Sequence, residues 1–233
     1  MPTVDDWVWG DESLLTREEK RDNAFAAKNN KDDNSSIRYY RFLCCALYLA
    51  HQLYTVYLIG PLPIWSYFWL TEWGWLLYGI YIFLATFYHW RHDIRGVAQA
   101  EYDSTSPFAS WKVITIMFQV SLALQSMITV VFWILIYPHM LEEWMNYRMY
   151  TTHGAALIFL IGDYLLNDIL VEKRHAVFTC IIMLFYTVNI IAVKFIFGME
   201  LYSFASLDSV GSWIATFCVG LTFMLTHYLI AVF

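Results

Sequence analysis

The stretch VITIMFQVSLALQSMITVVFWILI, residues 113–136, decides the fold of this chain. It contains no charged residue and exceeds the roughly 20 apolar residues that span the hydrocarbon core of a bilayer as an α-helix. The composition of the whole chain agrees, because 59% of the 233 residues are hydrophobic and only 15% are charged. An average soluble domain is about 25% charged. The sequence therefore predicts an integral membrane protein.

Six apolar blocks of this kind follow a polar segment, and most connections between them are short. Proline marks two of the breaks, at Pro61 and Pro138, because it has no amide proton for a helical hydrogen bond. We predict an all-α integral membrane bundle of six transmembrane helices, which together form a domain over 39–233. The helices are expected at about 39–59, 73–90, 112–137, 149–171, 176–197 and 212–233.

Lysine and arginine are distributed unevenly between the two ends of the predicted bundle. Of the 14 basic residues, all except Arg148 and Lys194 lie in the tail, near the first helix start, or in the second and fourth connections. Basic residues are enriched on the cytosolic side of membrane proteins. We therefore expect both termini on the cytosolic or matrix-equivalent face, which agrees with an even number of helices.

Residues 1–38 form a polar, acidic N-terminal tail, in which the run KNNKDDNSS at 28–36 is typical of a flexible segment. Such a tail offers a contact for protein partners in a membrane complex. The net charge of −6 argues against nucleic acid as a partner, because its phosphates require a basic surface. The four cysteines lie inside apolar blocks without metal-ligand spacing, so we expect no disulfide, metal or cofactor.

Polar side chains within the apolar blocks are costly in lipid and usually have a role. Counting depth at about 1.5 Å per residue along each helix, they fall into two levels. Thr71 and His153, at the starts of the second and fourth helices, share the outer level. The inner level is a polar intramembrane cluster of Asp163, Asn167, Gln119 and His227.

Thr71 and His153 have the residue types of a nucleophile and its base. A threonine hydroxyl becomes reactive when an imidazole within hydrogen-bond reach accepts its proton. An ester carbonyl and a water molecule can both arrive at this membrane level. The structural alternative is that Thr71 caps the second helix while His153 bonds a neighbouring backbone carbonyl.

Four short motifs support the chemical interpretation by their order and spacing. They are YFWLTEWGWLL at 67–77, VFWILIY at 131–137, His153-Gly154 followed by Asp163, and GMELY at 198–202 before Asp208. With these motifs, the region 65–233 resembles the rolling stone and androgen-induced family of multi-pass membrane proteins, some of which are threonine hydrolases.

The resemblance implies an activity and a substrate class. In the androgen-induced branch, a threonine nucleophile and a histidine hydrolyse fatty acid esters of hydroxy fatty acids. Matched position by position, these residues fall on Thr71 and His153. Thr115 is a rival match for the family's threonine, but it lies at the cytosolic end of the third predicted helix, far from His153. The resemblance further implies a lipid-ester substrate reached from the membrane lipids, in the endoplasmic reticulum or the plasma membrane.

Two other functional classes stay open at this stage. The polar tail and the abundance of Trp and Tyr also suit a non-catalytic accessory subunit of a larger membrane complex, such as a respiratory complex of the mitochondrial inner membrane. The inner polar level is compatible with a proton or ion path. A hydrogen-bonded clamp between helices would use the same residue types.

Overall fold

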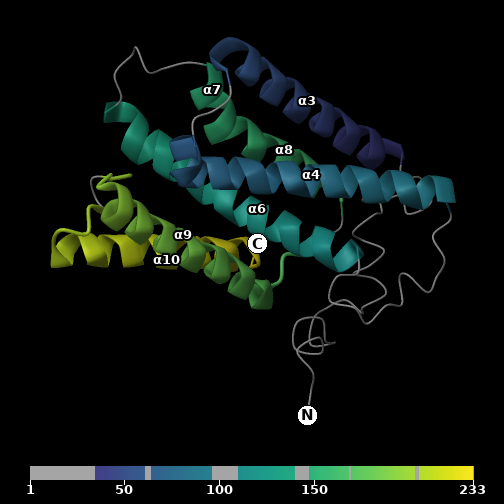
Figure 1. The fold of residues 1–233 in the computed structure, drawn as a ribbon. Helices are drawn as coiled ribbons and strands as arrows, with labels where there is room; N and C mark the ends of the chain where they lie inside the picture. The colour runs from purple at the N-terminus through teal and green to yellow at the C-terminus, as the bar shows by residue number, and fades with distance from the viewer. Residues whose placement is uncertain are drawn as a thin grey trace.

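The computed structural model describes residues 35–60, 64–95, 110–139, 147–167, 169–202 and 205–232. Every secondary-structure element in these ranges is a helix, which confirms the predicted all-α class (Figure 1). Residues 1–34 of the predicted tail and Pro61 lie outside the described residues. The last residues of the predicted tail, from Ser35, already belong to the first described helix.

Among the described residues, six helices have more than ten residues. They are α3 (Ser35–Ile59), α4 (Leu70–Arg95), α6 (Ser110–Val131), α8 (Ala156–Leu166), α9 (Ala176–Phe197) and α10 (Val210–Ile230). Three segments are long and apolar enough to cross a membrane: Trp111–Ile134, Lys173–Phe197 and Val210–Ile230. The chain is therefore a helical protein of the membrane-embedded class.

Several short helices adjoin these long ones. They are η1 (Ile64–Phe68) before α4, the π-helix η2 (Phe132–Ile136) after α6, η3 (Tyr137–His139) around Pro138, and η6 (Lys173–His175) before α9. The third predicted helix therefore changes form at its end, where α6 passes into the π-helix η2. Proline accounts for the change at η3, because it cannot donate the backbone hydrogen bond that would continue the helix.

The fourth predicted helix, 149–171, is interrupted and ends early. A short α7 (Tyr147–Tyr150) passes into the π-helix η5 (Thr151–Ala155), which continues as α8. Asn167 then adopts an extended conformation, and its side-chain oxygen accepts a hydrogen bond from the amide of Ile169 at 2.8 Å. Asparagine side chains compete in this way with helical backbone bonding. The helix therefore stops several residues before the predicted end.

The helix α6 lies at the centre of the packing. It contacts α4, α8 and α10, while α3 covers α4 and α8, and α9 lies against α10 (Figure 1). One apolar cluster joins α3, α4, α6 and α8, and a second joins α6, α9 and α10 to the start of α4. In the apolar 18-residue window of Trp111–Ile134, 61% of the residues are buried, whereas in that of Val210–Ile230 only 17% are. Most of α10 therefore faces outward, as expected for a lipid-facing helix.

Two tyrosines of α3 pack directly onto glycines of its neighbours. A Cβ atom added at Gly162 in α8 would overlap the ring and hydroxyl of Tyr40, and one added at Gly79 in α4 would overlap Tyr48. The Tyr40 hydroxyl also donates a hydrogen bond to the carbonyl oxygen of Phe159 at 2.9 Å. These contacts let α3 approach closely, as small residues do between membrane helices.

We expect Gly162→Ala to lower the free energy of unfolding by about 1–3 kcal/mol, because the added methyl group overpacks the α3 to α8 contact. The matched control is Gly220→Ala in α10, where no atom lies within 4 Å of the added Cβ. Unfolding in mixed detergent micelles measures both variants. Equal stability of the two would contradict this account, and Tyr40→Ala should relieve the effect of Gly162→Ala.

Candidate active site

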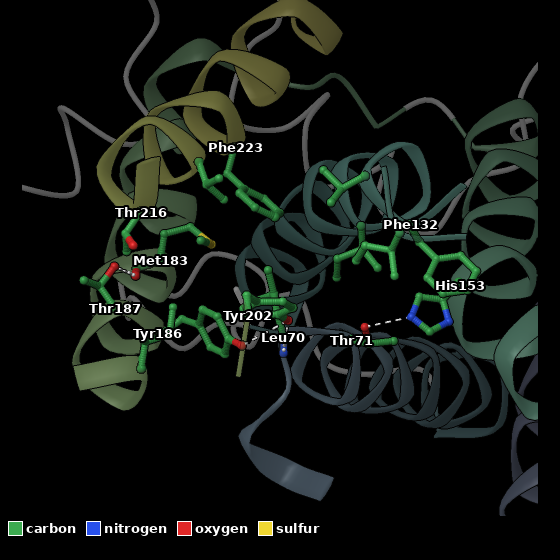
Figure 2. Close-up of a pocket in the computed structure, with 15 residues that line it drawn as sticks. Leu70, Thr71, Phe132, His153, Met183, Tyr186, Thr187, Tyr202, Thr216 and Phe223 are labelled. Carbon is green, nitrogen blue, oxygen red and sulfur yellow. Dashed lines mark hydrogen bonds between the residues drawn. The ribbon is translucent and has the colours of Figure 1, made fainter. Parts of the chain in front are cut away.

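The structure brings the two predicted site residues Thr71 and His153 together. Thr71 lies in the first turn of α4 and His153 lies in the middle of η5. The Thr71 Oγ1 atom is 3.0 Å from the Nε2 atom of His153, as Figure 2 shows. This is hydrogen-bond distance, so proton transfer between the two groups needs no large movement.

The second ring nitrogen of His153 determines which way that proton moves. Nδ1 lies 2.9 Å from the carbonyl oxygen of Met149 and 3.2 Å from Thr152 Oγ1. A carbonyl oxygen can only accept a hydrogen bond. Nδ1 therefore carries the ring proton and donates a hydrogen bond to the Met149 carbonyl oxygen. Nε2 of the neutral ring is then an acceptor for the hydroxyl proton of Thr71. The backbone contact expected by the structural alternative is thus present, on the ring nitrogen that faces away from Thr71.

Two residues of η2 hold His153, one at the face of its ring and one at its backbone. The ring of Phe132 stacks on that of His153 with centroids 3.6 Å apart. Trp133 Nε1 donates a hydrogen bond to the carbonyl oxygen of His153 at 3.2 Å. Both contacts come from the π-helical end of the third helix, which meets the second π-helix here. Such π segments are frequently found at functional sites.

An ion pair joins the two segments that carry the candidate dyad. Glu72 follows Thr71, and its carboxylate is paired with the guanidinium of Arg148, which lies one turn before Thr152. The two side chains are only 10% and 20% exposed, respectively. The charges are therefore largely withdrawn from solvent and hold the start of α4 against α7.

The N-terminus of α4 is anchored by side chains from α9 and the segment after it. Tyr202 accepts a hydrogen bond from the amide of Leu70 at 3.3 Å and another from the hydroxyl of Tyr186 at 3.3 Å. Asn189 Nδ2 donates to the carbonyl oxygen of Phe68 at 2.9 Å. Sequence reasoning did not assign these residues a role, although Tyr202 belongs to the GMELY motif.

The connection between α9 and α10 is held by a lysine that the topology prediction placed at the outer end of the bundle. Lys194 Nζ donates hydrogen bonds to Glu200 at 2.7 Å and Asp208 at 3.0 Å. The hydrogen bond from Lys194 lowers the pKa of the Asp208 carboxyl below its usual value. These contacts tether the segment that carries Tyr202.

A cavity of about 50 Å³ opens beside the candidate dyad. Apart from Thr71 and His153 its walls are mainly apolar side chains of α6, α9 and α10, including Phe132, Met183 and Phe223 (Figure 2). A buried water needs at least about 10–15 Å³ of such space. The cavity therefore accommodates water as it stands, and an acyl chain requires its apolar walls to move apart.

A larger groove of about 480 Å³ lies between α4 and α9. Trp73 and Leu77 line it from α4, and Ile182 and Phe185 from α9. The ring of Trp73 meets that of Tyr186 edge-on, with centroids 5.3 Å apart. Since Tyr186 also lines the smaller cavity, these two rings stand between the groove and the candidate dyad.

The predicted inner cluster divides into two separate groups. In the first, the carboxylate of Asp163 accepts hydrogen bonds from Arg41 Nε and Nη2 at 3.2 Å, from Asn167 Nδ2 at 2.9 Å, and from the Tyr81 hydroxyl. Arg41 and Asp163 are almost completely buried. The basic partner was missed by sequence reasoning, which counted Arg41 among the charges near the cytosolic end of the first helix.

In the second group, Gln119 and His227 hold the connection between α8 and α9. Gln119 Oε1 accepts from the amide of Glu172 at 3.0 Å and lies 3.0 Å from His175 Nδ1. His227 Nε2 lies 3.1 Å from the carbonyl oxygen of Glu172, and its Nδ1 lies 2.9 Å from Thr179 Oγ1. Both groups therefore join elements distant in sequence, as a structural clamp would.

No family model, curated protein or solved structure matches this chain. Within the described residues, no group of three or more His, Cys, Asp or Glu side chains converges in a way that would hold a metal ion.

We expect Asp163→Asn to lower the free energy of unfolding by about 3–5 kcal/mol, because it removes the carboxylate charge that faces the buried Arg41 guanidinium. The double variant Arg41→Met with Asp163→Leu should recover much of that loss, because apolar residues can replace a buried ion pair. Unfolding in mixed micelles measures both variants. A single variant as stable as the wild type would show that the pair does not hold α3 in place.

Proposed function

We propose that this chain is a membrane-embedded threonine hydrolase that cleaves carboxylic esters of lipids with the Thr71/His153 dyad. The observation that carries the proposal is the 3.0 Å contact between Thr71 Oγ1 and His153 Nε2. The Met149 carbonyl supports it, because it selects the ring tautomer in which Nε2 accepts the proton. Fatty acid esters of hydroxy fatty acids are the proposed substrate class, by the family resemblance.

The proposed reaction has two acyl-transfer steps. As Thr71 Oγ1 attacks the ester carbonyl carbon, its proton passes to His153 Nε2, which then donates it to the leaving alcohol oxygen. The bond from the carbonyl carbon to that oxygen breaks, and an acyl ester on Thr71 remains. A water molecule then attacks the ester and gives its proton to His153. Return of this proton to Thr71 Oγ1 releases the carboxylic acid.

The proposal includes a six-span arrangement with both termini on the cytosolic or matrix-equivalent side. At about 1.5 Å per residue, α3 with 25 residues and α4 with 26 residues exceed the hydrocarbon thickness of about 30 Å. The continuous helical segment 147–166 reaches about 30 Å. This arrangement puts Thr71 and His153 near the outer boundary, where lipid and water are both within reach.

The first test is labelling of the purified chain with a fluorophosphonate probe, which reacts with activated hydroxyl groups. We expect labelling of the wild type and of Thr71→Ser, and its loss in Thr71→Ala and His153→Ala, because neither of the latter retains the nucleophile and base together. Thr115→Ala is the matched control, since Thr115 is the rival threonine and lies outside the site.

Two outcomes would reject a hydrolase that uses the Thr71/His153 dyad. A folded wild type that stays unlabelled would favour the alternative of an accessory subunit in a larger membrane complex. Labelling that survives in Thr71→Ala would place the reactive hydroxyl elsewhere. Circular dichroism and size-exclusion chromatography on each variant verify that lost labelling does not come from misfolding.

A further inference from the structure

A stripe of three polar side chains on α6 has no role in the mechanism described so far. Ser121, Gln125 and Thr129 are four residues apart, so they lie along one face of the helix. Ser121 and Gln125 are completely buried. Within the described part of the chain, their hydroxyl and amide groups and the hydroxyl of Thr129 have no hydrogen-bond partner.

The central residue of this stripe lies directly beneath the candidate dyad. A Cβ atom built on Gly74 of α4 would be 2.9 Å from Gln125 Nε2, so the missing side chain of Gly74 makes room for the amide. Gly74 follows Thr71 by three residues, which places it on the same face of α4, about 4.5 Å further along the axis. Ile128, next to the same glycine, lines the cavity beside the dyad.

The other buried glutamine of α6, Gln119, forms hydrogen bonds to the protein with both ends of its side-chain amide. Gln119 uses its oxygen on the Glu172 amide and its nitrogen on the carbonyl oxygen of Leu170, at 2.9 Å. Gln125 has the same two donors and an acceptor oxygen, but its nitrogen lies against Gly74, which has no side chain to bond it. Buried polar groups that the protein leaves unbonded are typical sites for internal water.

We propose that Gln125, flanked by Ser121 and Thr129, forms an internal water site beneath the candidate dyad, and that this site supplies the water for deacylation. The proposal rests on the proposed hydrolase function. The Gln125 amide together with the adjacent hydroxyl of Ser121 or Thr129 supplies two or more of the two to four hydrogen bonds that a buried water makes, since those two hydroxyl-bearing residues lie about 12 Å apart along the helix. The acyl chain would lie between the mainly apolar walls of the outer cavity and displace water from it, so a polar site beneath the dyad offers a source of water besides the outer boundary.

In this scheme a water molecule moves from the Gln125 site to the acyl ester on Thr71. Its oxygen forms a bond to the carbonyl carbon while one of its protons passes to His153 Nε2. The bond between the carbonyl carbon and Thr71 Oγ1 breaks, and His153 returns the proton to that oxygen. The products are a carboxylic acid and the free enzyme, and no further reactant is required.

The variant Gln125→Met tests the proposal, because methionine has a similar length and cannot hold water by hydrogen bonds. The substrate is the 4-methylumbelliferyl ester of a medium-chain fatty acid, which reports acylation as a burst and deacylation as steady turnover. We expect one equivalent of fluorophore at nearly the wild-type rate, followed by turnover lowered roughly 10–100-fold, as when a reactant is no longer held in place.

The matched control is Gln52→Met on α3, where the amide donates to the Tyr48 hydroxyl at 2.9 Å and does not face the dyad. This variant should keep the wild-type burst and turnover. Gln125→Met should also unfold at the wild-type temperature or above, because it removes an amide that the protein itself does not bond. If Gln125→Met lowers the burst rate and the turnover rate by the same factor, or leaves both rates unchanged, the proposal is overturned.

A second measurement tests the water site without reference to activity. In water-edited NMR of protein labelled with ¹⁵N-glutamine, the side-chain amide of Gln125 should receive magnetisation from water, and its signal is assigned by its absence in Gln125→Met. No transfer to this amide would overturn the water site even in an active hydrolase. A wild type with neither labelling, burst nor turnover would instead reject the proposed function, and with it the deacylation role.

Discussion

The pairing of α4 with the segment formed by η5 and α8 is the constraint on which the candidate site depends. Two side-chain contacts join these helices with the same offset of 82 residues, Thr71 to His153 and Tyr81 to Asp163. The segments therefore run in the same direction, and about 15 Å of helix separates the two contacts. Arg41 from α3 holds the inner contact by its buried ion pair with Asp163. Sliding of α4 along α8 would break the contact between Tyr81 and Asp163, so this contact keeps the threonine in register with the histidine.

The absence of water in a bilayer explains why so many contacts surround this pair. Polar groups in lipid need partners within the protein, and the imidazole of His153 finds them in Thr71 and in the carbonyl oxygen of Met149. The same contacts orient the ring so that Nε2 faces the Thr71 hydroxyl, as a base must. One set of hydrogen bonds therefore gives the polar atoms of the His153 ring their partners and also positions the ring for proton transfer. The stripe centred on Gln125 is a part of this interior where the described residues supply no hydrogen-bond partners.

Sequence reasoning predicted the helical class and the shared level of Thr71 and His153, because the rise per residue converts position along a helix into depth. It grouped Asp163, Asn167, Gln119 and His227 by depth, whereas the structure divides them into two groups on different partners. Depth does not determine how each helix is rotated about its axis. That rotation selects the partners, and it is set by packing contacts such as Tyr40 on Gly162.

The sequence by itself determined that this chain forms long apolar helices, since their length and lack of charge leave few other structures in lipid. It also predicted the change of helix form at Pro138. Only the tertiary structure decided that Arg41 is the partner of Asp163, that Phe132 covers the ring of His153, and that Gln125 is left beneath Thr71. These are contacts between elements far apart in the chain. They depend on the rotation and close approach of whole helices, which no local pattern of residues specifies.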